Sequence, residues 1–179
     1  MNIYVALLHS IVLAAGRRVV MDDLRAMAEQ AGFSRPRTLA ATGNLVIETD
    51  ETLPVANLER RLEQGIVHVF GKQIDVIGRT AQQWKTLASE NPFPSESALN
   101  ASNVIVRVMR APLTGDALDR LEPCRSTSER LAVVNGDLWI SFGAKPSESR
   151  LLSQLTTRRL GAGTLRNWNT VRRLAGMLD

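Results

Sequence analysis

Two short turns constrain this chain more than any other feature, because each is flanked by runs of β-type residues. The first turn, Thr42-Gly43-Asn44, separates residues 37–41 from 45–49. The second, Asn135-Gly136-Asp137, separates residues 131–134 from 138–142. Asn-Gly between apolar runs is the strongest short signal for a β-hairpin. Two hairpins so far apart predict antiparallel strands in two successive parts of the chain.

The segments around the first turn predict the order βαββαβ. Residues 2–8 and 73–77 have the composition of strands. A helix is expected from Asp22-Asp23, acids that suit a first turn, to the stop at Gly32, and a second carries an apolar stripe from Leu58 to Val69. Thr80 with Gln83 resembles a capping box that begins a further helix. This order is the split ferredoxin-like arrangement, in which two helices cover one face of an antiparallel sheet.

The second part of the chain predicts a similar order. Residues 103–110 alternate as a strand, Thr114 caps a helix, and two C-terminal helices carry Leu151–Leu155 and Trp168–Leu178. The predicted fold class is therefore α+β, with two successive ferredoxin-like halves, antiparallel sheets and C-terminal helices. The expected domains are 1–90 and 103–179, joined by a linker at 91–102 because two prolines there disfavour helix.

Composition and charge narrow the class of protein. The 179 residues are 44% apolar, which is enough for a core, and Cys124 is the only cysteine. An internal disulfide and a four-cysteine zinc site are therefore excluded, and a reducing cytoplasm is expected. The apolar run at 3–15 follows no basic residue and is too short to span a bilayer, so neither a secretory signal nor membrane association is predicted. The formal net charge is +4, and residues 150–179 hold six arginines against one aspartate.

Several short segments together resemble a known family. They are Tyr4-Val5-Ala6-Leu7-Leu8, Met21 with Leu24-Arg25, Ala31-Gly32-Phe33, Gly43-Asn44 with Val46, Asn91-Pro92-Phe93-Pro94, and Arg166-Asn167-Trp168-Asn169-Thr170-Val171. On these motifs the chain resembles the uncharacterised bacterial domain of unknown function 1697 family. The resemblance implies a pair of ferredoxin-like halves and brings no established activity. Where the family typically has Arg-Gly-Ile-Asn-Val-Gly-Gly after its first strand, this chain has residues 9–16 without the arginine and two of the glycines, which puts any function of that loop in doubt.

No motif in the chain is diagnostic of catalysis. A P-loop and a GxGxxG pattern are missing, the two histidines His9 and His68 predict no metal site, and Cys124 beside Arg125 reads best as a loop thiol. The segment 161–164 instead leads small residues into a predicted helix start. Arg166, Asn167 and Asn169 would surround that start with a guanidinium and two amides, which is an anion-binding arrangement. The structural alternative is that Asn167 or Asn169 caps the helix while Trp168 packs into the core.

These patterns favour a binding module for a phosphorylated or nucleic-acid ligand. The predicted ligand-binding residues are Arg166, Asn167, Asn169, Arg150, Arg17 and Arg18. No cofactor or metal is expected, and nucleic acid, if bound, would be held through its phosphates because aromatic residues are few. Two alternatives stay open: a small-molecule enzyme with a site between the halves, and a protein-interaction or oligomeric role. The sequence does not set the oligomeric state.

Overall fold

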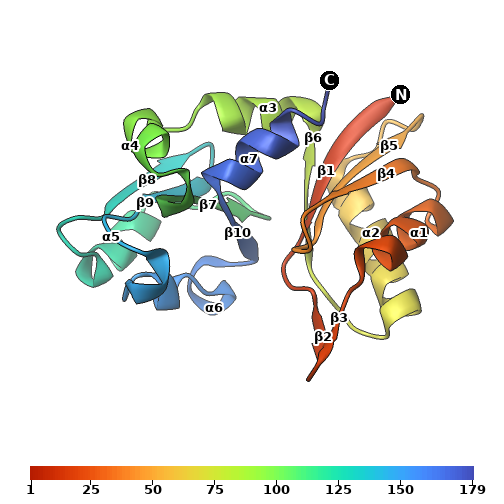
Figure 1. Ribbon diagram of the computed structural model, residues 1–179, viewed down its shortest axis with the longest axis horizontal. Coiled ribbons are helices and arrows are strands. Elements are labelled where there is room, and N and C mark those ends of the chain that lie inside the picture. The colour runs from red at the N-terminus through yellow and green to blue at the C-terminus, as the bar shows by residue number, and fades with distance from the viewer. The chain divides into compact units, whose positions relative to one another are not determined.

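The computed structural model describes residues 1–179, which form two compact units (Figure 1). Unit 1 comprises Met1–Thr86 together with Arg173–Asp179, and unit 2 comprises Leu87–Arg172. Both contain an antiparallel sheet and helices, which confirms the α+β class. No helix has the length and apolar character needed to cross a membrane.

Unit 1 is built on a four-stranded sheet. Its elements are β1 (Asn2–Leu8), β2 (Val12–Ala14), β3 (Arg17–Arg18), α1 (Met21–Gln30), β4 (Ser34–Leu39), β5 (Asn44–Thr49), α2 (Val55–Phe70), β6 (Val76–Thr80) and most of α3 (Ala81–Ser89). The sheet order is β4-β5-β1-β6, with antiparallel neighbours throughout. The first hairpin is thus confirmed. The predicted loop before α1 is wrong, since β2 and β3 form a small hairpin there.

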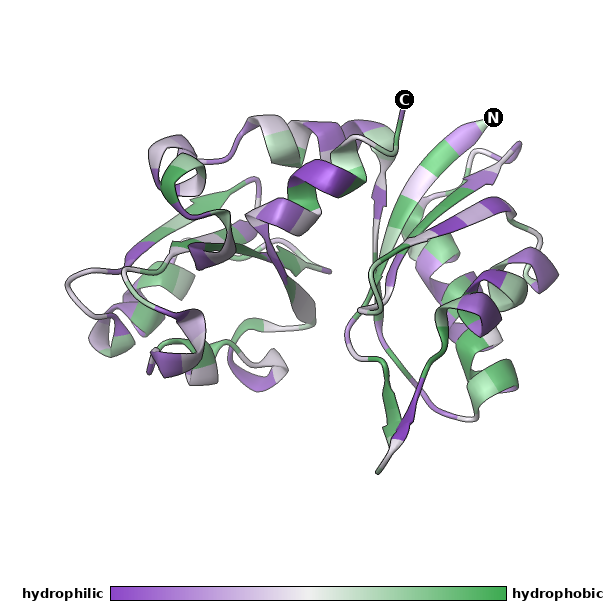
Figure 2. Cartoon of the chain, in the orientation of Figure 1, coloured by the Kyte–Doolittle hydropathy of each residue, from purple (hydrophilic) through white to green (hydrophobic).

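The core of unit 1 follows from regular periodicity. Helices α1 and α2 cover one face of the sheet (Figure 1). Hydrophobic positions recur along α2 between hydrophilic ones (Figure 2), and Leu58, Leu62 and Ile66 form its buried stripe. Gly65 lets α1 approach α2, because a Cβ there would lie 2.5 Å from the sulfur of Met27. The stretch between β5 and β6 is therefore filled by one long amphipathic helix.

Unit 2 has a second sheet of four strands. Its elements are α4 (Pro94–Leu99), β7 (Val104–Met109), α5 (Ala117–Leu121), β8 (Arg130–Val134), β9 (Asp137–Ser141), α6 (Thr157–Leu160), β10 (Gly163–Asn167), most of α7 (Trp168–Ala175) and 3₁₀ turns at 101–103, 122–124, 146–148 and 152–154. The sheet order is β10-β7-β9-β8, again antiparallel. As in unit 1, the first and third strands of the sheet lie in its centre.

Three predictions about the C-terminal half are wrong. The stretch 91–102 contains helix α4, because Pro94 occupies the first helical turn, where proline is tolerated. The residues expected to lead into the last helix form strand β10 instead. Gly163 allows this strand to pair closely, since a Cβ there would lie 2.9 Å from the carbonyl oxygen of Val108. The predicted helix around Leu151–Leu155 is a 3₁₀ turn, whereas the last helix is confirmed as α7.

The final residues of the chain pack with unit 1. The guanidinium of Arg37 donates to the carbonyl oxygen of Met177 at 2.9 Å, and Lys85 pairs with the Asp179 carboxylate at 2.6 Å. The ammonium of Lys85 lowers the pKa of the Asp179 carboxyl. The chain beyond α7 thus returns to the unit in which it began.

Candidate functional site

The six residues predicted to bind a ligand lie in three places. Arg17 and Arg18 are exposed on β3 in unit 1. Arg150 is exposed in unit 2, in the connection between β9 and β10. Arg166 and its neighbours lie where β10 passes into α7. Within unit 2, Arg150 lines a cavity to which Arg166, Asn167 and Asn169 do not contribute, so the predicted cluster does not form a single site.

Arg166 is part of the interior of unit 2, not of an open helix start. It sits on β10 with 8% of its surface exposed, opposite Val106 on β7. Its guanidinium donates to Thr164 Oγ1 and to the carbonyl oxygen of Leu165, both at 2.8 Å. Burial lowers the pKa of Arg166 to about 10. The prediction placed Arg166 beside a helix N-terminus; the strand places it on a sheet face.

Asn167 caps α7, as the structural alternative supposed. Its side-chain oxygen accepts hydrogen bonds from the backbone N–H of Thr170 at 3.0 Å and from the Thr170 hydroxyl at 3.1 Å. This cap occupies one of the first N–H groups of the helix. Asn169 lies further along and its side-chain oxygen accepts from the guanidinium of Arg172 at 2.9 Å. One backbone N–H at the start of α7, that of Thr170, therefore already has an acceptor within the chain.

Trp168, by contrast, is only half-buried and lines a cavity. Its ring centroid lies 6.1 Å from that of Trp139 with the planes tilted by 53°. The cavity holds about 430 Å³. We call it the Trp168 pocket; its lining residues are Ala88, Ser89, Asn91, Pro94, Ser97, Ala98, Ala101, Trp168 and Arg172.

The Trp168 pocket joins the two most distinctive motifs of the sequence. Asn91 and Pro94 come from the first motif, and Trp168 comes from the last. The amide of Asn91 donates to the Ser97 hydroxyl at 2.7 Å, while its oxygen accepts from the backbone N–H of Phe93 at 2.8 Å. These bonds fix the entry to α4 and hold one wall of the pocket in place.

The side chains that line the pocket carry a single charge. Arg172 is the only charged residue among those that line it, and serine hydroxyls, an amide and small apolar side chains make up the rest. No His, Cys, Asp or Glu lines it, so these walls provide no general base for neutral pH. Neither Arg172 nor the role of Asn91 was predicted from the sequence as part of a site. The arginine excess of the C-terminal segment was the only signal for Arg172.

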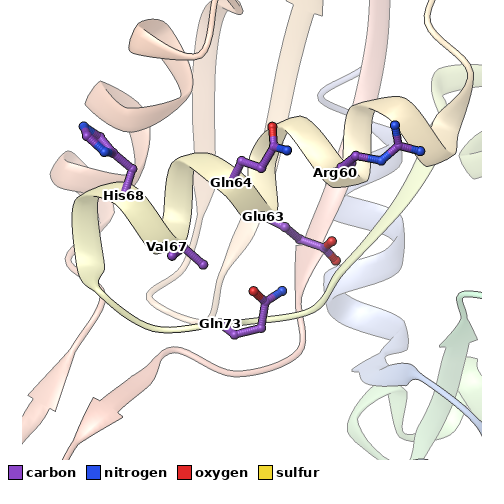
Figure 3. A pocket seen from close by; sticks show the side chains of 6 residues that line it. All are labelled: Arg60, Glu63, Gln64, Val67, His68 and Gln73. Atoms are coloured by element: carbon purple, nitrogen blue, oxygen red, sulfur yellow. The ribbon is translucent and has the colours of Figure 1, made fainter.

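Three further cavities contain residues considered in the sequence, and one of them, of about 580 Å³ on the β2–β3 hairpin of unit 1, is lined by Arg17 and Arg18. Arg150 lines one of about 360 Å³ in unit 2, together with the half-buried thiol of Cys124. His68 lines one of about 490 Å³ on α2 (Figure 3). In Figure 3 the side chains of Gln64 and His68 point away from Gln73, so the polar groups do not converge. No group of three or more His, Cys, Asp or Glu side chains is placed to hold a metal ion.

The fold and its cavities define an α+β protein with two similarly ordered antiparallel sheets and, in the second unit, a cavity lined by Trp168 and Arg172. The chain belongs to the family described as "Protein of unknown function (DUF1697)", whose model matches residues 1–139. Asn91 lies within the matched residues and Trp168 beyond them. No curated protein matches the chain.

A solved structure supports the fold along the whole chain. The chain is similar to a conserved bacterial protein from Streptococcus pneumoniae, with 18% sequence identity and a TM-score of 0.75. The match covers 99% of this chain and 98% of that one. At this identity the likeness shows the fold alone.

Proposed function

We propose that the protein is a binding module and that its Trp168 pocket holds a small phosphorylated molecule with a planar ring. The observation that carries the proposal is the pairing of Trp168 and Arg172 in one cavity. The two residues are four apart on α7, a spacing that places side chains on the same helix face. An indole surface and a guanidinium are thus offered to one ligand.

Each group suits one part of such a ligand. A tryptophan face stacks on planar rings, and an arginine fork binds phosphate through parallel hydrogen bonds. Asn169 accepts from Arg172 at 2.9 Å, which orients the guanidinium before a ligand arrives. The amide and hydroxyls of the pocket provide hydrogen bonds for the remaining polar atoms.

A small ligand is favoured over nucleic acid. Binding to a nucleic-acid backbone uses many phosphate contacts, whereas the pocket has one cation. Arg150 lines a separate cavity, and Arg17 and Arg18 belong to the other unit, so the proposal does not use them. A bacterial cytoplasmic setting is part of the proposal and is consistent with the free thiol of Cys124.

We also propose that each of the two units is a ferredoxin-like half. In each unit the first and third strands of the sheet are central and the second and fourth are at its edges. This order is the one expected for ferredoxin-like halves, and it supports that assignment for both units.

The proposal is tested by thermal unfolding of the full chain with adenosine monophosphate as the probe. We expect a rise in melting temperature that grows with ligand concentration, because a ligand that binds only the folded state stabilises it. Arg172→Gln should weaken binding about tenfold through loss of a charge-assisted contact. Trp168→Phe should weaken it less, because a smaller aromatic face remains.

The matched control is Arg158→Gln. Arg158 is an exposed arginine of the same unit that does not line the Trp168 pocket. Unchanged binding in Arg158→Gln, with loss in Arg172→Gln, supports a specific site. Equal losses in the two variants, or no stabilisation of the unmodified chain, would refute the proposal.

A further inference from the structure

A second cavity in unit 2 has the composition of an anion site. It lies where the segment before β8 meets the connection after β9, and we call it the Arg150 pocket. Its volume is about 360 Å³, and its lining residues are Pro123, Cys124, Arg125, Ser126, Ser128, Glu129, Ala144, Lys145, Glu148, Ser149 and Arg150. It shares no lining residue with the Trp168 pocket.

The walls of the Arg150 pocket are fixed by a buried carboxylate. Glu129 is 5% exposed, accepts from the backbone N–H of Ser126 at 2.9 Å, and accepts from the Ser149 hydroxyl. One carboxylate therefore ties both wall segments together. Gly143 allows the two wall segments to approach each other, since a Cβ at this position would lie 2.4 Å from Cβ of Ser128. A pocket held in this way is already organised for a ligand.

The cationic side chains of the pocket differ in whether they already have partners within the protein. The guanidinium of Arg125 donates from Nε to Glu122 at 2.9 Å and from a terminal nitrogen to the carbonyl oxygen of Glu129 at 2.7 Å. Lys145 and Arg150 are exposed, and their side chains have neither a hydrogen bond nor an ion pair. Two positive charges thus line the cavity without a protein partner.

Hydroxyl groups complete the lining. Ser126 Oγ and Ser128 Oγ lie 3.1 Å apart, so one bonds to the other and a donor or acceptor remains for a ligand. Glu148 is the opposing feature, because its carboxylate lines the same cavity and would repel an anion. We propose that the Arg150 pocket binds the dianionic phosphate group of a small molecule through Lys145, Arg150 and the serine hydroxyls.

This inference goes beyond the proposed function, because it concerns a different cavity and a ligand with no planar ring. It makes unit 2 a module with two anion sites. Free phosphate and a small phosphomonoester present the same chemistry here. The test therefore uses inorganic phosphate and glycerol 3-phosphate side by side.

Isothermal titration of the full chain with each probe measures the site directly. We expect saturable binding that the double variant K145Q/R150Q weakens at least about tenfold, since two charge-assisted contacts are lost. Glu148→Gln should tighten binding about two- to threefold by removing a like charge. Tighter binding of glycerol 3-phosphate than of phosphate supports a phosphomonoester, and equal binding supports free phosphate.

Controls separate this site from general attraction to a basic surface and from the Trp168 pocket. Arg158→Gln removes an exposed charge outside the pocket and should leave phosphate binding unchanged. Arg172→Gln should leave unchanged the phosphate binding that K145Q/R150Q removes, although it weakens nucleotide binding at the Trp168 pocket. No binding of either probe, or equal weakening by Arg158→Gln and by K145Q/R150Q, would overturn the inference.

Discussion

The two sheets share a strand order, but the connections between their third and fourth strands are built differently. In unit 1, α2 runs unbroken between β5 and β6 and buries a continuous stripe. In unit 2, the chain between β9 and β10 is divided into two 3₁₀ turns and the short helix α6. A segmented connection leaves polar side chains free to line cavities, and Lys145 and Arg150 lie on it. The difference teaches that the same strand order can be closed by one long helix in one unit and by a segmented connection in the other, and the segmented one lines a cavity with charged side chains.

The central strands of the two sheets also differ, because the one in unit 2 contains a buried charge. In β1 of unit 1, residues Val5 to Leu8 are apolar and buried. In β7 of unit 2, Arg107 is 2% exposed and donates to the carbonyl oxygens of Leu155 at 3.1 Å and Gly161 at 2.9 Å. A buried cation thus ties the irregular connection to its sheet. Its Nε has no partner, and burial lowers the pKa of the guanidinium.

The largest expected effect comes from Arg107→Met. The change leaves the two carbonyl groups without their donor, and we expect the free energy of unfolding to fall by roughly 2–4 kcal/mol. Denaturation followed by tryptophan fluorescence checks this, because Trp139 and Trp168 lie in unit 2 and Trp84 in unit 1. Unchanged or increased stability would mean that an apolar side chain serves as well as the cation.

The hairpins of the two units offer a second comparison. Gly136 has a φ of 84°, and a Cβ there would lie 2.5 Å from Cβ of Pro112. Gly16 has a φ of 72° with no atom within 4 Å of that position. Gly16→Ala should cost about 1 kcal/mol for its backbone conformation alone, and Gly136→Ala about 2–3 kcal/mol because the clash is added. Urea denaturation of both variants measures the two losses in free energy of unfolding. Equal losses would contradict the clash expected at Gly136.

The cap of α7 gives a smaller effect. Asn167→Ala removes the acceptor of the Thr170 N–H, and the free energy of unfolding should fall by about 1 kcal/mol. Asn167→Asp keeps an acceptor and should restore most of the loss. If both variants unfold alike, the cap does not contribute as described.

The smallest effect concerns alkaline pH. The pKa of Arg166 is lowered to about 10 by burial, so the protonated side chain disfavours folding below that pH. Above about pH 10 the folded chain loses the proton of Arg166 while the unfolded chain still keeps it. The free energy of unfolding therefore rises as pH increases from about 10 towards the ordinary pKa of arginine. Relative to Arg166→Met, the wild-type chain should gain about 0.4 kcal/mol between pH 8 and 10. The lowered pKa of Arg166 would be contradicted if the difference in free energy of unfolding between the two chains stayed constant from pH 8 to 10, or if it changed in favour of Arg166→Met.

The sequence predicted the parts of the fold that depend on local chemistry. Both hairpins follow from their glycine and asparagine turns, and the capping box at Thr80 and Gln83 forms with bonds of 2.9 and 3.1 Å. Strand β10 was missed because it is a short edge strand with an arginine facing inwards, and its glycines resemble those of a helix entry. Its strand conformation depends on pairing with β7, which is a tertiary effect.

The candidate sites were less accessible to prediction. The capping alternative for Asn167 was recognised, but burial of Arg166 depends on the cross-strand position opposite Val106. The Trp168 pocket depends on α4 lying beside α7, and the Arg150 pocket on the bonds of Glu129 to two segments. Neither contact leaves a local pattern, so the sequence could indicate a basic segment but not the cavities.

The most direct test of ligand binding in unit 2 is the indole N–H signal of each tryptophan during titration with adenosine monophosphate, with Trp168 assigned from Trp168→Phe. We predict that the Trp168 signal shifts with saturation and that the Trp84 signal does not. Arg172→Gln should greatly reduce the shift. A stationary Trp168 signal, or one that moves only in step with Trp84, would contradict the account.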